Sequence, residues 1–166
     1  MGSIFGVKCE KCDYRFTVDI GHGFLGCGFF EPGLKSEKPR FYDYINSKRI
    51  LSDIEELIET KNDVWEDKEA YSRREQWRGH GSAQYICPNC GRLHNKFYFR
   101  LKYDGGFYEP KYYCSSCKRK LVCVELISAE TESIIIKSDQ KIDWKCPNCG
   151  GKKLIFDVEA GYTCYD

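Results

Sequence analysis

The sequence lacks the apolar runs that membrane-spanning helices need, and its first residues, from Met1 to Cys9, contain no basic region followed by an apolar stretch. We therefore expect neither a membrane anchor nor a signal peptide. The sequence also contains an odd number of cysteines, 11, so they cannot all be paired within the chain. An odd number argues against the fully paired disulfide framework of a secreted protein and predicts a cytoplasmic location.

The chain has little excess charge of either sign, with 26 Lys and Arg against 25 Asp and Glu, a formal net charge of +1. The 11 cysteines could alter this balance, because a divalent metal ion held by four of them displaces four protons and changes the charge by about −2, so two such sites would leave about −3. This balance excludes a generally cationic nucleic-acid binder but allows a local basic patch. With a mean hydropathy of −0.56, the expected core is thin, and bound metal would supply folding energy.

Four Cys-x-x-Cys pairs contain eight of the cysteines. Two intervening residues let the chain turn tightly, so both sulfurs bind one ion while backbone N–H groups point at the thiolates. One pair alone is typical of a redox dithiol, but four pairs favour metal, and the pentapeptide Cys-Pro-Asn-Cys-Gly occurs twice, at 87–91 and 146–150. The sequence therefore predicts two zinc ions, with iron as the alternative metal, bound by Cys9, Cys12, Cys87, Cys90, Cys114, Cys117, Cys146 and Cys149.

The four pairs can form two sites in three ways. We expect neighbours along the chain to share an ion, so that Cys9/Cys12 joins Cys87/Cys90 and Cys114/Cys117 joins Cys146/Cys149, because short connections usually join spatial neighbours. In the alternative, the two middle pairs share an ion across an ordinary ribbon span, and the two outer pairs meet each other.

The stretch at about 35–81 contains no cysteine and has a helical period. We expect a short helix beginning near Pro39, a second with a capping box from Ser52 to Glu55, and a third opening at a box from Asp63 to Glu66. After the second cysteine pair, a period of two predicts a strand at 97–103 with a turn at 104–106. Residues of high strand propensity predict further strands at 121–127, 133–137 and 154–158.

These elements predict a small metal-stabilised α+β protein made of two zinc ribbons, each built from short antiparallel hairpins. The first ribbon would occupy residues 1–113 and would contain the helical insertion and a following hairpin. The second would occupy residues 114–166.

Three segments resemble a family of small uncharacterised bacterial zinc-ribbon, rubredoxin-like proteins. They are Cys9-Glu-Lys-Cys-Asp-Tyr-Arg-Phe16, Gly21-His-Gly-Phe24 and Tyr85-Ile-Cys-Pro-Asn-Cys-Gly91, followed by the last Cys-Pro-Asn-Cys-Gly segment at 146–150. The resemblance implies a zinc-ribbon fold in which helices separate the first two cysteine pairs. It implies no established activity.

Other residues carry weaker signals. The glycine-rich loop at 19–30 holds His22 and Cys27, which could bind metal or act as proton carrier and nucleophile, although a buried turn is the simpler interpretation. His80 lies in a similar Gly-His-Gly segment, and His94 is expected at the surface or beside the thiolates. Cys123 is expected in the core, and Cys164 carries no sign of reactivity.

The expected function is a noncatalytic zinc-binding module that mediates protein–protein interaction, because closed tetrathiolate sites leave no position for substrate. Trp65, Tyr71 and Trp77 are candidate anchors for a protein partner. The first alternative is nucleic-acid binding through 118–120 and 152–153, with base stacking on Tyr98, Phe107, Tyr108, Tyr112 and Tyr113. The second is a rubredoxin-like iron electron carrier.

Overall fold

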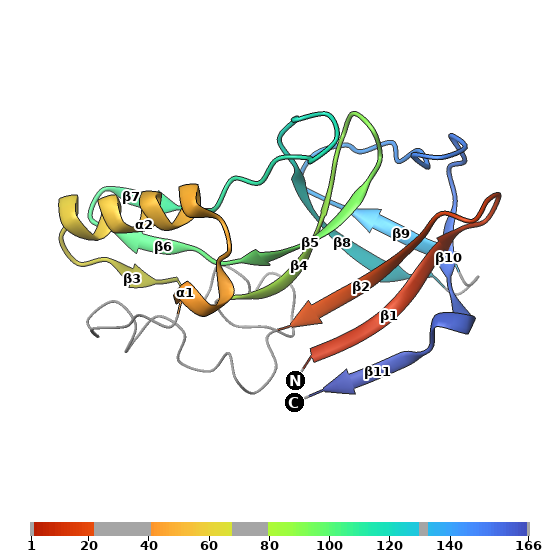
Figure 1. Ribbon diagram of the computed structural model, residues 1–166, viewed down its shortest axis with the longest axis horizontal. Coiled ribbons are helices and arrows are strands. Elements are labelled where there is room, and N and C mark those ends of the chain that lie inside the picture. Colours follow the sequence, from red (N-terminus) through yellow and green to blue (C-terminus); the bar gives the residue numbers. More distant parts are fainter. Residues whose placement is uncertain (1, 22–40, 68–79, 130–132, 166) are drawn as a thin grey trace. The chain divides into compact units, whose positions relative to one another are not determined.

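A computed structural model of the chain describes residues 2–21, 41–67, 80–129 and 133–165. These residues group into two units, and Figure 1 labels their elements. The barrel unit contains Met1–Gly21, Ser82–Lys96 and Tyr112–Asp166, and the helix unit contains His22–Gly81 and Phe97–Lys111. In the described ranges, no helix is long and apolar enough to cross a membrane.

Six strands of the barrel unit close on themselves. β10 pairs with β9, β9 with β8, β8 with β4, β4 with β2, β2 with β1, and β1 returns to β10. The closing contact aligns Val7 with Phe156 and Cys9 with Leu154. The six strands are β1 (Gly2–Cys9), β2 (Arg15–Gly21), β4 (Gly81–Ile86), β8 (Val122–Ser128), β9 (Ser133–Lys137) and β10 (Leu154–Phe156).

Three further elements attach to this barrel. β5 (Leu93–Tyr98) pairs with β4. A 3-10 turn, η2 (Val158–Ala160), leads into β11 (Tyr162–Tyr165), which pairs with the first half of β1 in the register Gly2↔Tyr165. The two ends of the described chain therefore lie side by side (Figure 1).

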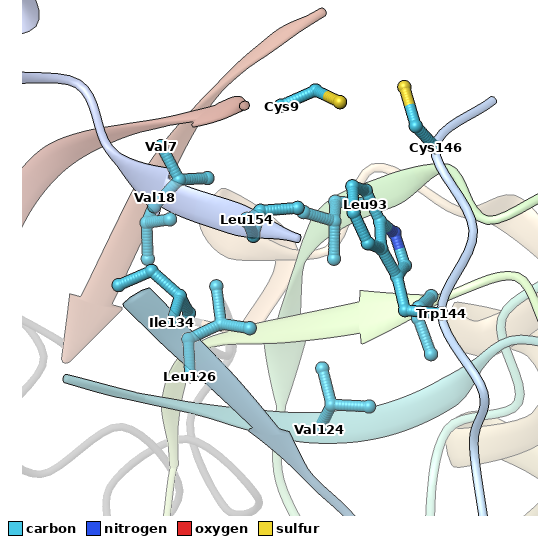
Figure 2. Close-up of a cluster of buried hydrophobic side chains, with 11 residues drawn as sticks. Val7, Cys9, Val18, Leu93, Val124, Leu126, Ile134, Trp144, Cys146 and Leu154 are labelled. Atoms are coloured by element: carbon cyan, nitrogen blue, oxygen red, sulfur yellow. The ribbon is translucent and has the colours of Figure 1, made fainter. Parts of the chain in front are cut away.

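The barrel interior is filled by alternating apolar side chains of its strands. Val18 and Val124 are fully buried, and Val7, Leu154 and Trp144 are nearly so. Figure 2 shows this cluster, with Cys9 and Cys146 at one end of it. Cys9 and Cys146 thus belong to the packed core of this unit.

The helix unit contains α1 (Phe41–Tyr44), α2 (Lys48–Thr60) and a three-stranded sheet in the order β3-β6-β7. The strands are β3 (Trp65–Glu66), β6 (Leu101–Tyr103) and β7 (Gly106–Tyr108). One face of α2 is buried, through Ile50, Ile54 and Leu57. Tyr108 donates a hydrogen bond of 3.1 Å from its hydroxyl to Asp53 on this helix.

The predicted α+β arrangement of two ribbons with a helical insertion is wrong, because the described chain is mostly β and six strands form one closed barrel. The individual strands at 133–137 and around 121–127 and 154–158 are confirmed. What differs is their pairing: β10 adds to β1 across the length of the chain, so the expected separate hairpins share a single sheet.

The helix predictions are partly wrong. α2 is confirmed, but it begins after Ser47, whose hydroxyl accepts the N–H of Ile50, rather than at the box at Ser52. No helix opens at Asp63. That residue has a φ of 52°, and the following Trp65 and Glu66 pair with β6 as a strand. Pro39 and residues 68–79 lie outside the described ranges.

Candidate metal centre

The eight predicted cysteines form two clusters of four, both in the barrel unit. Within each cluster the four sulfur atoms lie within 4.8 Å of one another, so each could hold a metal ion. We call the first the outer cluster, because it joins the first and last cysteine pairs, and the second the inner cluster. The outer cluster is Cys9, Cys12, Cys146 and Cys149, and the inner cluster is Cys87, Cys90, Cys114 and Cys117.

The predicted pairing of sequence neighbours is therefore wrong. The alternative is correct: the two middle pairs form one cluster and the first and last pairs form the other, which we call the nested pairing. The barrel strands explain why. β4 runs into Cys87 and pairs with β8, which follows Cys117, in the register Ile86↔Val122. β1 runs into Cys9 and pairs with β10, which follows Cys149, in the register Cys9↔Leu154. In both cases, a strand entering one cysteine pair lies beside a strand leaving its partner.

The sulfur separations fit a tetrahedral ion. In the outer cluster, Cys9 Sγ lies 3.6 Å from Cys149 Sγ, and Cys12 Sγ lies 3.5 Å from Cys146 Sγ. Zinc–sulfur bonds of about 2.3 Å place tetrahedral sulfurs about 3.8 Å apart, whereas a disulfide bond is only about 2.0 Å long. The outer cluster is thus arranged for one ion and not for disulfides.

The inner cluster has similar dimensions. Cys87 Sγ lies 3.2 Å from Cys117 Sγ, and Cys90 Sγ lies 3.7 Å from Cys114 Sγ and 3.9 Å from Cys117 Sγ. Two tetrathiolate sites of this kind fit a zinc-ribbon-like module.

All four cysteine pairs have the same backbone closure. The N–H of the first cysteine donates to the carbonyl five residues later, in Tyr14, Arg92, Arg119 and Gly151, at 2.7 to 2.9 Å. The residue just after the second cysteine has a positive φ in three pairs, 70° at Gly91 and Gly150 and 59° at Lys118. Glycine suits that conformation, whereas the Lys118 side chain makes it strained.

Backbone N–H groups stabilise part of the thiolate charge. The N–H of Arg119 is the main cause that lowers the pKa of Cys117 to about 6. At Cys114, burial raises the pKa, but N–H groups of Cys117 and Ser116 and the imidazole of His94 outweigh it and lower the pKa to about 7. Burial raises the pKa of Cys90 to about 12. Metal binding would require all four thiols to be deprotonated, with the positive ion compensating the charge.

His94 therefore lies beside the thiolates, which is one of the two positions that the sequence predicted for it, the other being the surface. Its Nε2 is buried, without a hydrogen-bond partner among the described residues. His80, in the helix unit, is buried with its Nδ1 2.5 Å from Glu66 Oε1, which the sequence did not predict. His22 and Cys27 lie outside the described residues.

The remaining candidates are placed as follows. Cys123 is half-buried in β8, and Cys164 is exposed in β11. Of the aromatic residues proposed for base stacking, Tyr98 is buried, whereas Phe107 and Tyr113 are exposed by 57% and 45%. Trp65 is exposed by 47%, and Tyr71 and Trp77 lie outside the described ranges.

Sequence reasoning missed Trp144, whose buried indole joins the two cysteine clusters through Gly91. The expectation that backbone N–H groups point at the thiolates is confirmed, but it did not name the donor, which lies two residues after each second cysteine. The recurring Cys-x-x-Cys spacing was sufficient to identify this position.

Comparison of the chain with family models, curated proteins and solved structures found no match.

Proposed function

We propose that the chain is a noncatalytic zinc-binding module in which two zinc ions hold the ends of the barrel strands together. The observation that carries this proposal is the grouping of all eight Cys-x-x-Cys sulfurs into two clusters of four. Four thiolates complete the tetrahedral coordination of zinc, so no position remains for a substrate or an activated water. Thiolate ligands also favour zinc or iron over magnesium or calcium.

Metal analysis of the purified protein tests this proposal. We expect two zinc ions per chain by native mass spectrometry, and loss of the barrel's circular-dichroism signal when a strong chelator removes them, because the ligands join strands with a small core. Iron with a reversible colour change on reduction would instead support the electron carrier. A single metal ion, or none, would contradict the proposal.

We further propose a protein as the partner of the helix unit. Among the residues that the structure describes in this unit, three large aromatic side chains are exposed, Tyr42 by 43%, Trp65 by 47% and Phe107 by 57%. Tyrosine and tryptophan are frequent anchors of protein interfaces. The double substitution Trp65→Ala and Phe107→Ala should abolish co-purification of a partner from the native cell while the metal content stays at two. Unchanged co-purification would contradict this assignment.

A further inference from the structure

The two cysteine clusters share a backbone but differ in the side chains that surround them. Arg92 and Arg119 hold equivalent positions in the inner cluster, each donating its backbone N–H to the second cysteine of its pair, Cys90 or Cys117. Those two sulfurs lie 3.9 Å apart, so the backbones of both arginines lie on the same side of the cluster. In the outer cluster, the equivalent residues are Tyr14 and Gly151, which are uncharged.

Lys118 and Lys120 flank Arg119, and we call these two lysines with Arg92 and Arg119 the inner rim. All four side chains are exposed. Among the described residues, none of the four forms an ion pair, and Lys118 Nζ donates only to the carbonyl of Ser115, at 2.8 Å.

The cations beside the outer cluster, in contrast, form ion pairs. Lys153 pairs with Glu10 at 2.6 Å, and Lys152 pairs with Asp143 at 3.6 Å. Arg15 pairs with Asp157 at 3.3 Å and with Glu159 at 2.7 Å. The cations beside the outer cluster are thus largely compensated by carboxylates of the same unit.

A simpler explanation is that the inner rim only offsets thiolate charge. A zinc tetrathiolate carries about −2, whereas the inner segments 87–92 and 114–120 carry four cations and no carboxylate. The outer segments 9–15 and 146–153 also carry four cations, but Glu10 and Asp13 cancel two of them. With zinc bound, the outer cluster would therefore be neutral, whereas the inner one would keep two positive charges in excess.

The excess charge fits a phosphate backbone. Arginine forks match phosphate oxygens in pairs, and lysines add point charges. Tyr113 pairs with Lys120 in an antiparallel bridge, which places both side chains on the same face of the hairpin. The Tyr113 ring is exposed by 45% and could stack on an unpaired base.

An acidic protein segment fits the inner rim less well. Protein interfaces are depleted in lysine and depend on buried apolar anchors. Within the described segments 87–92 and 112–120, Tyr113 is the one large hydrophobic side chain that is exposed, and the other exposed residues besides the rim are small or polar, namely Pro88, Asn89, Ser115 and Ser116. Neutral polar groups of this kind contact phosphates and sugars readily.

From these observations we infer that the inner rim of the barrel unit binds single-stranded nucleic acid, with Arg92 and Arg119 contacting phosphates. The inference goes beyond the partner proposed for the helix unit, and it rests on the proposed zinc sites because they fix both arginine backbones.

The test compares two double variants that remove equal charge. Arg92→Gln with Arg119→Gln removes the inner pair, and Lys152→Gln with Lys153→Gln is the matched control at the outer cluster. Binding of a labelled oligouridylate of about 12 nucleotides is followed by fluorescence anisotropy at salt concentrations from about 50 to 200 mM. The metal content of each protein is measured in the same preparation.

We expect the wild-type affinity to fall steeply with salt. The inner variant should bind about tenfold more weakly at low salt, and its log–log salt slope should be shallower by about 1.4, for two lost phosphate contacts on a single strand. The control should stay within about twofold of the wild type.

Three results would overturn the inference: no saturable binding by a chain that holds two metal ions, equal weakening in both variants, or tighter binding of a polyglutamate peptide through the same arginines. The third would assign the rim to an acidic protein segment. A chain holding fewer than two metal ions would contradict the zinc proposal and this inference together, whereas a two-metal chain that fails to bind contradicts this inference alone.

Discussion

The indole Nε1 of Trp144 donates a hydrogen bond of 2.9 Å to the backbone carbonyl of Gly91. Gly91 directly follows Cys90 of the inner cluster, and Trp144 lies two residues before Cys146 of the outer cluster. The bond is buried, so it is protected from competition by water. This hydrogen bond therefore holds the segment that leads into Cys146 of the outer cluster against the turn that follows Cys90 of the inner cluster.

Gly91 and Gly150 allow a matched test of how closely the backbone before Cys146 approaches Gly91, because both glycines end a Cys-Pro-Asn-Cys-Gly segment with a φ of 70°. A Cβ on Gly91 would lie 1.8 Å from the carbonyl oxygen of Lys145, whereas one on Gly150 would meet nothing within 4 Å. Gly150→Ala should lower the free energy of unfolding by about 1–2 kcal/mol through its left-handed backbone. Gly91→Ala should cost about 1–3 kcal/mol more from overpacking. Equal losses in denaturant titrations would contradict the close approach of Lys145.

The nested pairing predicts which metal each cysteine variant loses. Cys9→Ser should release the ion shared with Cys146 and Cys149, because serine supplies no thiolate charge. Cys114→Ser should release the other ion. Native mass spectrometry should find close to one metal in each variant. Hydrogen exchange should show lost protection near Leu154 in Cys9→Ser and near Val122 in Cys114→Ser. Loss of protection near Val122 in Cys9→Ser, with Leu154 unaffected, would refute the pairing.

Tyr14 should make stability depend on alkaline pH. Its hydroxyl accepts the N–H of Leu93 at 3.1 Å, and burial raises the pKa of Tyr14 above its ordinary value. The unfolded chain therefore loses this proton first, at about pH 10. The stabilising contribution is complete below that pH and is lost as pH rises through the folded pKa.

The variant Tyr14→Phe isolates this contribution. It leaves the Leu93 N–H without its acceptor and should cost about 1–2 kcal/mol at neutral pH. The difference in the free energy of unfolding between wild type and variant, measured by denaturant titration, should shrink as pH is raised above about 10. A difference that stays constant up to pH 11 or more would mean that burial does not shift the Tyr14 proton.

His94 should strengthen metal binding at one cluster only. Its imidazole contributes to lowering the pKa of Cys114, so it favours the thiolate that a metal ion needs. His94→Ala should weaken binding at the inner cluster about tenfold. Competition with a chromogenic chelator should then show one weakened site and one unchanged site. Two weakened sites would indicate a general loss of structure instead.

Local signals predicted the four Cys-x-x-Cys turns and several strands, because both depend on residues close in sequence. The Cys-x-x-Cys spacing selects its turn by itself, and the consecutive β-branched residues Ile134, Ile135 and Ile136 fall within β9 as expected. The burial of Ile50, Ile54 and Leu57 on α2 also follows from their helical spacing.

The pairing of the clusters could not be predicted in this way. It depends on the alignment of Cys9 with Leu154, which no turn residue or short loop specifies. The two Cys-Pro-Asn-Cys-Gly copies are identical, so nothing in them distinguishes a partner. The helix expected at Asp63 failed for a related reason, since pairing of Trp65 with Lys102 in β6 overrides the local capping pattern.

Nested pairing also sets an order for biosynthesis. The closest inner sulfurs belong to residues 24 to 30 positions apart, whereas those of the outer cluster are 134 to 140 positions apart. Because translation proceeds from the N-terminus, the inner cluster is complete while Cys146 has still to be made. Cys9 and Cys12 are made first, but their partners Cys146 and Cys149 are made last. We therefore expect zinc to bind the inner cluster of the nascent chain before it binds the outer cluster.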